Sequence, residues 1–237
     1  MSPRLPSLLD PPVGFAHRGA RAHAPDNTLE SFALALRLGA TGLESDVWIT
    51  ADGKAVLDHD GVVGSRLRRR GISEVDVADL PEHIPTLAQL YELCGPEVDL
   101  SLDVKDPAAA AEVVATARDA GAEQRLWLCH PDLDTVASWR PMSSSARLVH
   151  STRLAALSNG PERHAADLSR RGVDAVNLHH SEWTGGNIVL YHRFEVLAMG
   201  WDAQFERVLA GLLDAGIDAV FSDHVDRMVN CLQRLGG

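Results

Sequence analysis

The chain has 237 residues, of which 45% are hydrophobic and 23% charged. These proportions are typical of a folded globular protein and exclude disordered, collagenous and disulfide-scaffold chains. Acidic residues outnumber lysines and arginines by 33 to 22, a formal net charge of -11, so no nucleic-acid partner is expected and a cation is easier to accommodate.

The three cysteines, Cys94, Cys129 and Cys231, show no CxxC spacing. An odd number without such spacing favours free thiols in a reducing compartment. The N-terminal segment lacks the apolar core of a signal peptide, and no apolar run approaches the roughly 18 residues of a membrane span. We therefore expect a cytoplasmic protein without a transmembrane segment.

Short apolar runs alternate with helical patterns along the chain, which is the order of a parallel α/β protein. The first strand is expected at Val13–Ala16 and the first helix at Thr28–Leu38, with Asn27 as its cap and Gly39 at its end. The other strands are expected at Gly42–Trp48, Asp99–Val104, Leu126–Cys129, Ala146–His150, Asp174–Leu178, Phe194–Ala198 and Asp218–Ser222.

Two later helices have clear ends, one from Asp106 to Gly121 and one over Ala203–Ala215. Two words that begin at Gly172 and Gly216 repeat the same Gly-x-Asp-Ala-Val step from a helix end into a strand. Eight such units favour a closed (β/α)₈ TIM barrel over an open doubly wound sheet. Residues 1–237 are therefore interpreted as one domain.

A hairpin interrupts this alternation after the second strand, because Asp52-Gly53 stands between two extended runs. With these two residues as the loop, Asp46 lies opposite His59, and a bulge would shift the pairing by one. The segment of about 61–85 is then a short insertion before the strand Asp99–Val104, the fourth strand when the hairpin return is counted. Its arginines are interpreted as a solvated loop, with attraction to an anion or headgroup as the alternative. They are Arg66, Arg68, Arg69 and Arg70.

Carboxylates gather at the ends of the expected strands, where a parallel barrel builds its active site. Glu44, Asp46 and Asp103 converge on one mouth in this arrangement. A hard divalent ion, Mg²⁺ or Ca²⁺, suits such an all-oxygen set. The alternative is a salt-bridge network in which Arg18 and Lys105 neutralise the carboxylates without metal.

Two histidines, His17 and His59, lie beside this cluster by the same argument. An imidazole near neutral pKa is suited to acid/base work, although each histidine taken alone could have a surface or structural role. Arg18 can bind a phosphate oxygen through its planar fork and Lys105 as a point charge. The whole set predicts phosphoryl chemistry.

Several words in this chain resemble those of the glycerophosphodiester phosphodiesterase family, in the same order and over nearly the whole length from His17 to about Asp223. They are His17-Arg18-Gly19, Pro25-Asp26-Asn27-Thr28, Glu44-x-Asp46, His59-Asp60, Pro85-Thr86-Leu87 and Asp103-x-Lys105. The resemblance implies a (β/α)₈ barrel that hydrolyses glycerophosphodiesters to glycerol 3-phosphate and an alcohol. It also implies one divalent cation and two catalytic histidines.

Carried over by position, the resemblance implies a role for each matching residue. Glu44, Asp46 and Asp103 would be the metal ligands. His17 and His59 would be the acid/base pair, in an order that stays open. Arg18 and Lys105 would hold the phosphate. Trp201 would bind substrate, for example a choline group by a cation–π contact, whereas Trp183 is expected to be a packing residue.

Two departures from the family pattern leave open how the ion is held, directly or through water, and which substrate is preferred. The third ligand is usually Glu and is Asp103 here, and the late word is usually Trp-Thr-Val-Asn and is Trp201-Asp202-Ala203-Gln204 here. Loop histidines could line the pocket or stay exposed without a ligand role. They are His130, His179 and His180. The alternative functions are a lysophospholipase D-like or cyclising phosphodiesterase on lysolipids, or a non-catalytic phosphodiester-binding barrel.

Overall fold

The computed structural model describes residues 4–64 and 68–235 of the chain. Within these residues, eight parallel strands form a closed ring in the order β1-β11-β10-β9-β8-β7-β6-β2, and the pairing of β1 with β2 closes it. The bounds are β1 Val13–Ala16, β2 Gly42–Ile49, β6 Asp99–Val104, β7 Leu126–His130, β8 Arg147–Ser151, β9 Ala175–His179, β10 Leu197–Trp201 and β11 Ala219–Ser222. The predicted (β/α)₈ barrel is confirmed.

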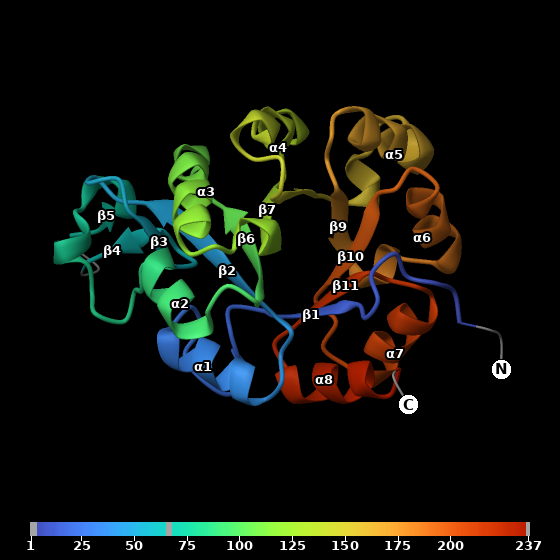
Figure 1. The fold of residues 1–237 in the computed structure, drawn as a ribbon, viewed down its shortest axis with the longest axis horizontal. Coiled ribbons are helices and arrows are strands. Elements are labelled where there is room, and N and C mark those ends of the chain that lie inside the picture. Colours follow the sequence, from blue (N-terminus) through green and yellow to red (C-terminus); the bar gives the residue numbers. More distant parts are fainter. Residues whose placement is uncertain (1–3, 65–67, 236–237) are drawn as a thin grey trace.

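Helices surround this ring and cover the outer faces of its strands (Figure 1). Their bounds are α1 Leu29–Arg37, α2 Leu87–Cys94, α3 Ala110–Asp119, α4 Leu133–Ser138, α5 Gly160–Arg170, α6 Gly185–His192, α7 Glu206–Asp214 and α8 Val225–Gln233. In the described part of the chain, none of these helices combines the length and the apolar composition needed to cross a membrane.

Three predicted boundaries are wrong, each for a local reason. The strand expected at Phe194 begins at Leu197, because the chain leaves α6 through a turn in which Glu195 takes a φ of 59°. Helix α7 begins at Glu206 rather than Ala203, whose amide instead donates to the Phe221 carbonyl of β11. The cap of α1 is Thr28, whose hydroxyl accepts the Ser31 amide at 3.2 Å, and not Asn27.

The hairpin register differs by one residue from the prediction for a two-residue loop. Strand β3 (Ala55–Leu57) pairs antiparallel with β2 so that Val47 lies opposite Leu57. One residue further from the loop, the Asp58 amide donates to the Asp46 carbonyl, so Asp46 lies opposite Asp58. The loop has three residues, 51–53, because Gly53 adopts a φ of 77° and Thr50 donates its amide to Lys54 across it. His59 therefore does not lie opposite Asp46.

The insertion forms a small unit beside the hairpin, at the left of Figure 1. Its strands β4 (Val62–Val63) and β5 (Arg70–Gly71) pair antiparallel. Arg68, Arg69 and Arg70 are exposed, as a solvated loop requires, and Arg66 lies outside the described residues.

The barrel interior below the mouth is filled by large apolar side chains. Phe15 stacks on Phe221 with ring centroids 4.9 Å apart and meets Trp127 edge-on at 5.6 Å. The indole of Trp127 donates to Asp99 at 2.8 Å, which anchors the filling to β6. A packed floor of this kind confines chemistry to the ends of the strands.

The repeated Gly-x-Asp-Ala-Val word has a structural role in both copies. The carboxylate of Asp174 accepts the Leu148 amide of β8, and that of Asp218 accepts the Ala198 amide of β10. Each aspartate stands immediately before its own strand, so it ties that strand to its neighbour in the ring.

Candidate active site

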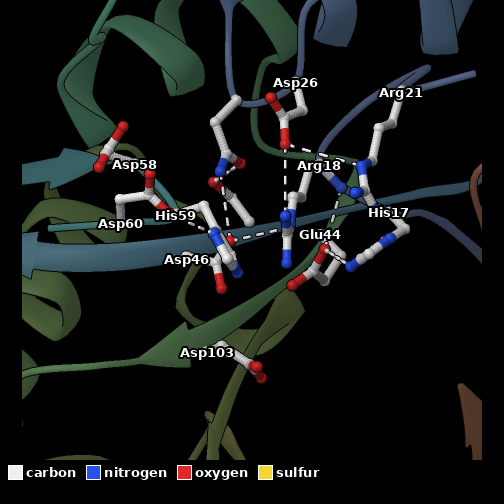
Figure 2. Close-up of polar contacts among 12 residues, drawn as sticks. His17, Arg18, Arg21, Asp26, Glu44, Asp46, Asp58, His59, Asp60 and Asp103 are labelled. Atoms are coloured by element: carbon white, nitrogen blue, oxygen red, sulfur yellow. Dashed lines mark hydrogen bonds and ion pairs between the residues drawn. The ribbon is translucent and has the colours of Figure 1, made fainter.

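The three carboxylates predicted as metal ligands lie together at the mouth of the barrel (Figure 2). Parallel pairing of β2 with β6 places Asp46 directly beside Asp103, and Glu44 is two residues earlier on the same face of β2. One oxygen from each side chain lies within 4.8 Å of the others. Glu44 and Asp46 are buried, whereas Asp103 is partly exposed.

Crowding and burial separate the pKa values of these groups. Burial raises the pKa of Glu44 to about 8, and the neighbouring Asp46 and Asp103 add to the rise. The pKa of Asp46 is lowered although its burial opposes this, because Lys105 and Arg18 favour its charged form. The pKa of Asp103 is raised by desolvation and by Asp46, against the effect of Lys105.

Two cationic side chains contact this cluster, and both form an ion pair with Asp46. Lys105 Nζ lies 2.8 Å from Asp46 and 3.3 Å from Asp103, and Arg18 Nε lies 3.1 Å from Asp46. Glu44 instead accepts the Arg18 backbone amide at 2.9 Å. The salt-bridge network of the alternative interpretation therefore exists around Asp46.

The donor set also fits a divalent cation. Three carboxylates against two cationic side chains leave the cluster at -1 when all are ionised, and a phosphodiester adds a further negative charge. Oxygen-only ligands are those that Mg²⁺ and Ca²⁺ prefer. One such ion would bring the cluster to +1, which an anionic substrate requires.

Asn27 holds the central carboxylate in place, a role that the sequence analysis missed. Its amide nitrogen donates to Asp46 at 3.2 Å, and its side-chain oxygen accepts the Ser45 hydroxyl at 2.8 Å. The residue is buried and adopts a φ of 54°, a conformation that asparagine tolerates better than most residues. The available signal was its place in the word that follows His17-Arg18-Gly19.

His17 lies between two carboxylates at the end of β1. Its Nδ1 atom is 2.6 Å from Asp223 Oδ1, and its Nε2 atom is 3.8 Å from Glu44 Oε2. Because a carboxylate only accepts, Nδ1 carries the proton in this pair and Nε2 is left to exchange one. Burial acts to lower the pKa of His17, but Glu44 and the Asp223 hydrogen bond outweigh it and raise the pKa.

His59 lies apart from this pair, at the end of the cluster away from His17 (Figure 2). Its Nδ1 atom lies 2.8 Å from Asp60, and its side chain is 48% exposed. The structure thus places the two predicted catalytic histidines on either side of the carboxylates, one held by a partly buried carboxylate and one open to solvent.

A cavity of about 230 Å³ opens next to the carboxylates at the mouth. Its lining residues are Glu44, Asp103, Ser151, Asn177, Trp201 and Phe221. Trp201 lines this cavity, and its role in substrate binding stays a prediction. Trp183 is buried, and its indole N–H donates a hydrogen bond to the Met199 carbonyl. Ser151 and Asn177 were missed, although both stand at the ends of expected strands. The Asn177 Oδ1 atom is buried without a hydrogen-bond partner among the described residues.

The side chain of Arg153 makes a cation–π contact with the ring of Trp201. The guanidinium carbon of Arg153 lies 4.6 Å from the indole centroid, and Glu182 holds the same guanidinium at 3.6 Å. The His179 ring meets Trp201 at 4.6 Å in an edge contact. A choline group could reach this ring face only by displacing Arg153.

The three loop histidines follow β7 and β9. His130 is the last residue of β7, and its Nδ1 atom accepts the amide of Asp132, the N-cap of α4. His179 and His180 lie together at the end of β9, with ring centroids 4.3 Å apart. They form a cluster with Asp202 that does not include the three carboxylates.

Comparison with known proteins agrees with this architecture. The Glycerophosphoryl diester phosphodiesterase family matches residues 17–227. A glycerophosphodiester phosphodiesterase of Caldanaerobacter subterraneus subsp. tengcongensis is 36% identical over 95 residues, which cover 34% of this chain and 39% of that relative. The match thus spans about two fifths of the curated relative's length.

Two solved structures share the fold at low sequence identity. The glycerophosphodiester phosphodiesterase of Thermotoga maritima has a TM-score of 0.78 at 21% identity and covers 92% of this chain and 97% of its own. An Oleispira antarctica phosphodiesterase in complex with the product sn-glycerol-3-phosphate has a TM-score of 0.77 at 22% identity and covers 94% and 97%. With the family match over most of its length, the chain belongs to the glycerophosphoryl diester phosphodiesterase family.

Proposed function

We propose that the chain is a metal-dependent phosphodiesterase that hydrolyses glycerophosphodiesters to glycerol 3-phosphate and an alcohol. The observation that carries this proposal is the convergence of Glu44, Asp46 and Asp103 within 4.8 Å at the barrel mouth, between the two histidines. A cytoplasmic location and a lysophospholipid as second substrate class stay predictions.

The proposed cation is Mg²⁺ or Ca²⁺, held by the carboxylates of Glu44, Asp46 and Asp103. When bound, such an ion stabilises negative charge that develops on phosphoryl oxygens. Asn27 and Lys105 orient the Asp46 carboxylate through contacts of 3.2 and 2.8 Å, so the ligand set is preorganised.

Arg18 and Lys105 bind the phosphodiester in this proposal. Their partners Asp26, Asp46 and Asp103 use only some of the donors that a guanidinium and an ammonium group carry. The remaining donors can reach phosphoryl oxygens placed next to the carboxylates. Donors fixed by ion pairs lose little freedom on binding, which favours stabilisation of the transition state.

His17 and His59 transfer protons to and from the reacting oxygens. Asp223 accepts a hydrogen bond from His17 Nδ1 and so leaves Nε2 directed toward Glu44 at the mouth. Asp60 lies 2.8 Å from His59 Nδ1 and can accept a hydrogen bond from it, as Asp223 does from His17. One histidine removes a proton from the attacking oxygen and the other protonates the leaving alcohol, in an order that stays open.

The substrate class rests on the relatives and on the cavity. The Oleispira antarctica phosphodiesterase is described with sn-glycerol-3-phosphate, and this chain shares its fold. The cavity beside Glu44 and Asp103 has room for a three-carbon polyol, since its volume is about 230 Å³. Its wall combines polar Ser151 and Asn177 with aromatic Trp201 and Phe221.

The test is the release of glycerol 3-phosphate from glycerophosphocholine, glycerophosphoethanolamine and glycerophosphoglycerol. Each is assayed with chelator and then with Mg²⁺ or Ca²⁺ restored. Glu44→Gln removes one of the three carboxylate ligands and is expected to abolish turnover, whereas Glu92→Gln on the exposed face of α2 keeps it. Phosphorus NMR of the product distinguishes free glycerol 3-phosphate from a cyclic phosphate.

Turnover that persists in chelator, or in Glu44→Gln, would contradict the proposed metal site. A folded protein that turns over lysophospholipids but none of the three glycerophosphodiesters would replace the substrate class. A folded protein that is inactive on both classes would favour the non-catalytic phosphodiester-binding barrel.

A further inference from the structure

A second cluster of ligand side chains lies at the barrel rim, built from His179, His180 and Asp202. His179 is the last residue of β9, His180 follows it, and Asp202 follows the last residue of β10. One potential ligand atom from each side chain lies within 4.8 Å of the other two. Unlike the acidic cluster, this one offers two imidazoles and one carboxylate.

The spacing of two of these groups suits a tetrahedral ion. His179 Nε2 lies 3.3 Å from Asp202 Oδ2. Two ligands bound at about 2.1 Å in tetrahedral geometry are separated by about 3.4 Å, so this pair needs almost no movement to share an ion. The His180 ring, 4.3 Å from that of His179, completes the set by a side-chain rotation.

Neighbouring side chains orient both members of this pair. The Ser181 hydroxyl lies 2.7 Å from His179 Nδ1, and the Ser181 amide donates to the same nitrogen at 3.3 Å, so Ser181 fixes the orientation of the His179 ring. The amide of Gln204 donates to Asp202 Oδ1 at 3.1 Å and leaves Oδ2 directed at His179. Supporting hydrogen bonds of this kind are typical of metal ligands.

His180 is the third member of this cluster and follows His179 directly in the chain. Among the described residues, the hydrogen bonds of the cluster hold His179 and Asp202 and leave the nitrogens of the His180 ring available.

Two of the three residues that distinguish the late motif of this chain contribute to the cluster. Asp202 supplies the carboxylate and Gln204 orients it, at positions where the family word usually has Thr and Asn. The departure noted in the sequence thus gives a ligand set that a threonine could not provide.

We infer that His179, His180 and Asp202 bind a divalent ion that prefers imidazole ligands, such as Zn²⁺, at the rim of the barrel mouth. The acidic cluster, with oxygen ligands alone, is suited to Mg²⁺ or Ca²⁺ instead. Three protein ligands leave a coordination position open for water or a substrate oxygen. The ion would lie next to Trp201, whose ring meets that of His179 and lines the substrate cavity.

The test is Zn²⁺ binding measured by calorimetry on the full chain in saturating Mg²⁺, which occupies the acidic cluster. We expect the wild type to bind Zn²⁺, and His180→Ala and Asp202→Asn to bind it at least tenfold more weakly. Asparagine is chosen at 202 because the residue there has a φ of 62°. His224→Ala is the matched control, because it disrupts the other histidine-aspartate group of the rim, formed with His23 and Asp226.

Absence of Zn²⁺ binding in the wild type would overturn the inference, as would wild-type affinity in both His180→Ala and Asp202→Asn. Loss of the ion only in His224→Ala would also overturn it. A second readout is the electron paramagnetic resonance spectrum of bound Cu²⁺, in which nitrogen hyperfine splitting reports imidazole ligands. This splitting is expected in the wild type and is reduced in His180→Ala. Binding is measured without substrate, so it is independent of the proposed hydrolysis.

Discussion

His17 Nδ1 lies 2.6 Å from Asp223 Oδ1 although 206 residues separate the two in the chain. The contact follows from barrel closure, because β1 pairs with β11 in a register that matches Ala16 with Ser222. His17 and Asp223, which follow Ala16 and Ser222, therefore lie at the same level of the barrel mouth. Asp223 is therefore a positioning residue for His17.

Asp223→Asn is expected to lower kcat by about 10- to 100-fold with little change in KM. The amide can donate a hydrogen bond to Nδ1, which favours the wrong tautomer and directs the Nε2 proton into the mouth. Steady-state kinetics on glycerophosphoglycerol give the two constants. Asp226→Asn, three residues further on and exposed, is the control. A change confined to KM would contradict the positioning role.

Removal of the metal is expected to abolish turnover. Addition of Mg²⁺ or Ca²⁺ is then expected to raise the thermal unfolding midpoint of the wild type but not that of Glu44→Gln. A cation that binds the folded chain stabilises it, by about 2.7 kcal/mol at a hundredfold excess over Kd. Glu44→Gln is expected to lack this stabilisation because it loses one of the three carboxylates and its negative charge. Differential scanning fluorimetry across a metal titration measures the effect. Equal shifts in wild type and variant would place the ion elsewhere.

Asn27→Ala is expected to destabilise the fold and to reduce activity together. The variant loses hydrogen bonds to Ser45 and Asp46 and must place alanine at a φ of 54°. These effects together lower the free energy of unfolding by about 2–4 kcal/mol. Thr28→Ala, which removes the cap of α1 and the hydrogen bond from the Thr28 hydroxyl to the Pro25 carbonyl, costs about 1 kcal/mol and keeps activity. Urea unfolding of both variants makes the comparison, and equal losses would contradict the role of Asn27.

Arg153→Ala is expected to increase the preference for choline substrates. Arg153 covers the Trp201 ring at 4.6 Å, so its removal frees a face for a quaternary ammonium group. The ratio of kcat/KM for glycerophosphocholine over glycerophosphoglycerol should rise about 3- to 10-fold. Arg163→Ala on the exposed surface of α5 is the control. An unchanged ratio would show that the headgroup does not reach Trp201.

A buried chain of hydrogen bonds makes stability depend on pH. His150 Nε2 donates to the Pro131 carbonyl, which can only accept, so His150 Nδ1 accepts from His164 Nε2 at 2.8 Å. His164 Nδ1 then accepts the Tyr191 hydroxyl at 2.9 Å. All of these hydrogen bonds can form together only while the imidazoles of His150 and His164 are both neutral. Burial lowers the pKa of His164 to about 4.

The unfolded chain binds a proton at this histidine below about pH 6.5, and the folded chain does so only near pH 4. Stability is therefore complete above pH 6.5 and is lost progressively as the pH falls toward 4, by about 2 kcal/mol at pH 5. His164→Gln should lose less stability than the wild type between pH 7.5 and pH 5, and His83→Gln, at an exposed site, should behave as the wild type. Urea unfolding at the two pH values measures this, and parallel losses in all three proteins would refute it.

Much of the candidate site was predictable because strand periodicity is local. Residues two apart on a strand share a face, so Glu44 and Asp46 were expected together from their spacing, and Asp103 joined them through the rule that parallel strands end at one mouth. The hairpin register was not predictable to the residue. It depends on whether the loop holds two or three residues, which Gly53 decides by its backbone conformation.

By itself the sequence determined the alternation of strands and helices, the carboxylates and basic groups at strand ends, and the resemblance to a phosphodiesterase family. These features follow from short sequence motifs and from the spacing of apolar residues along the chain. Only the tertiary structure decided that Asp223 holds His17, that Arg153 covers Trp201 and that Asp202 joins His179. Each of these contacts joins segments that are distant in sequence, and their geometry exists only once the ring of strands is closed and its register is set.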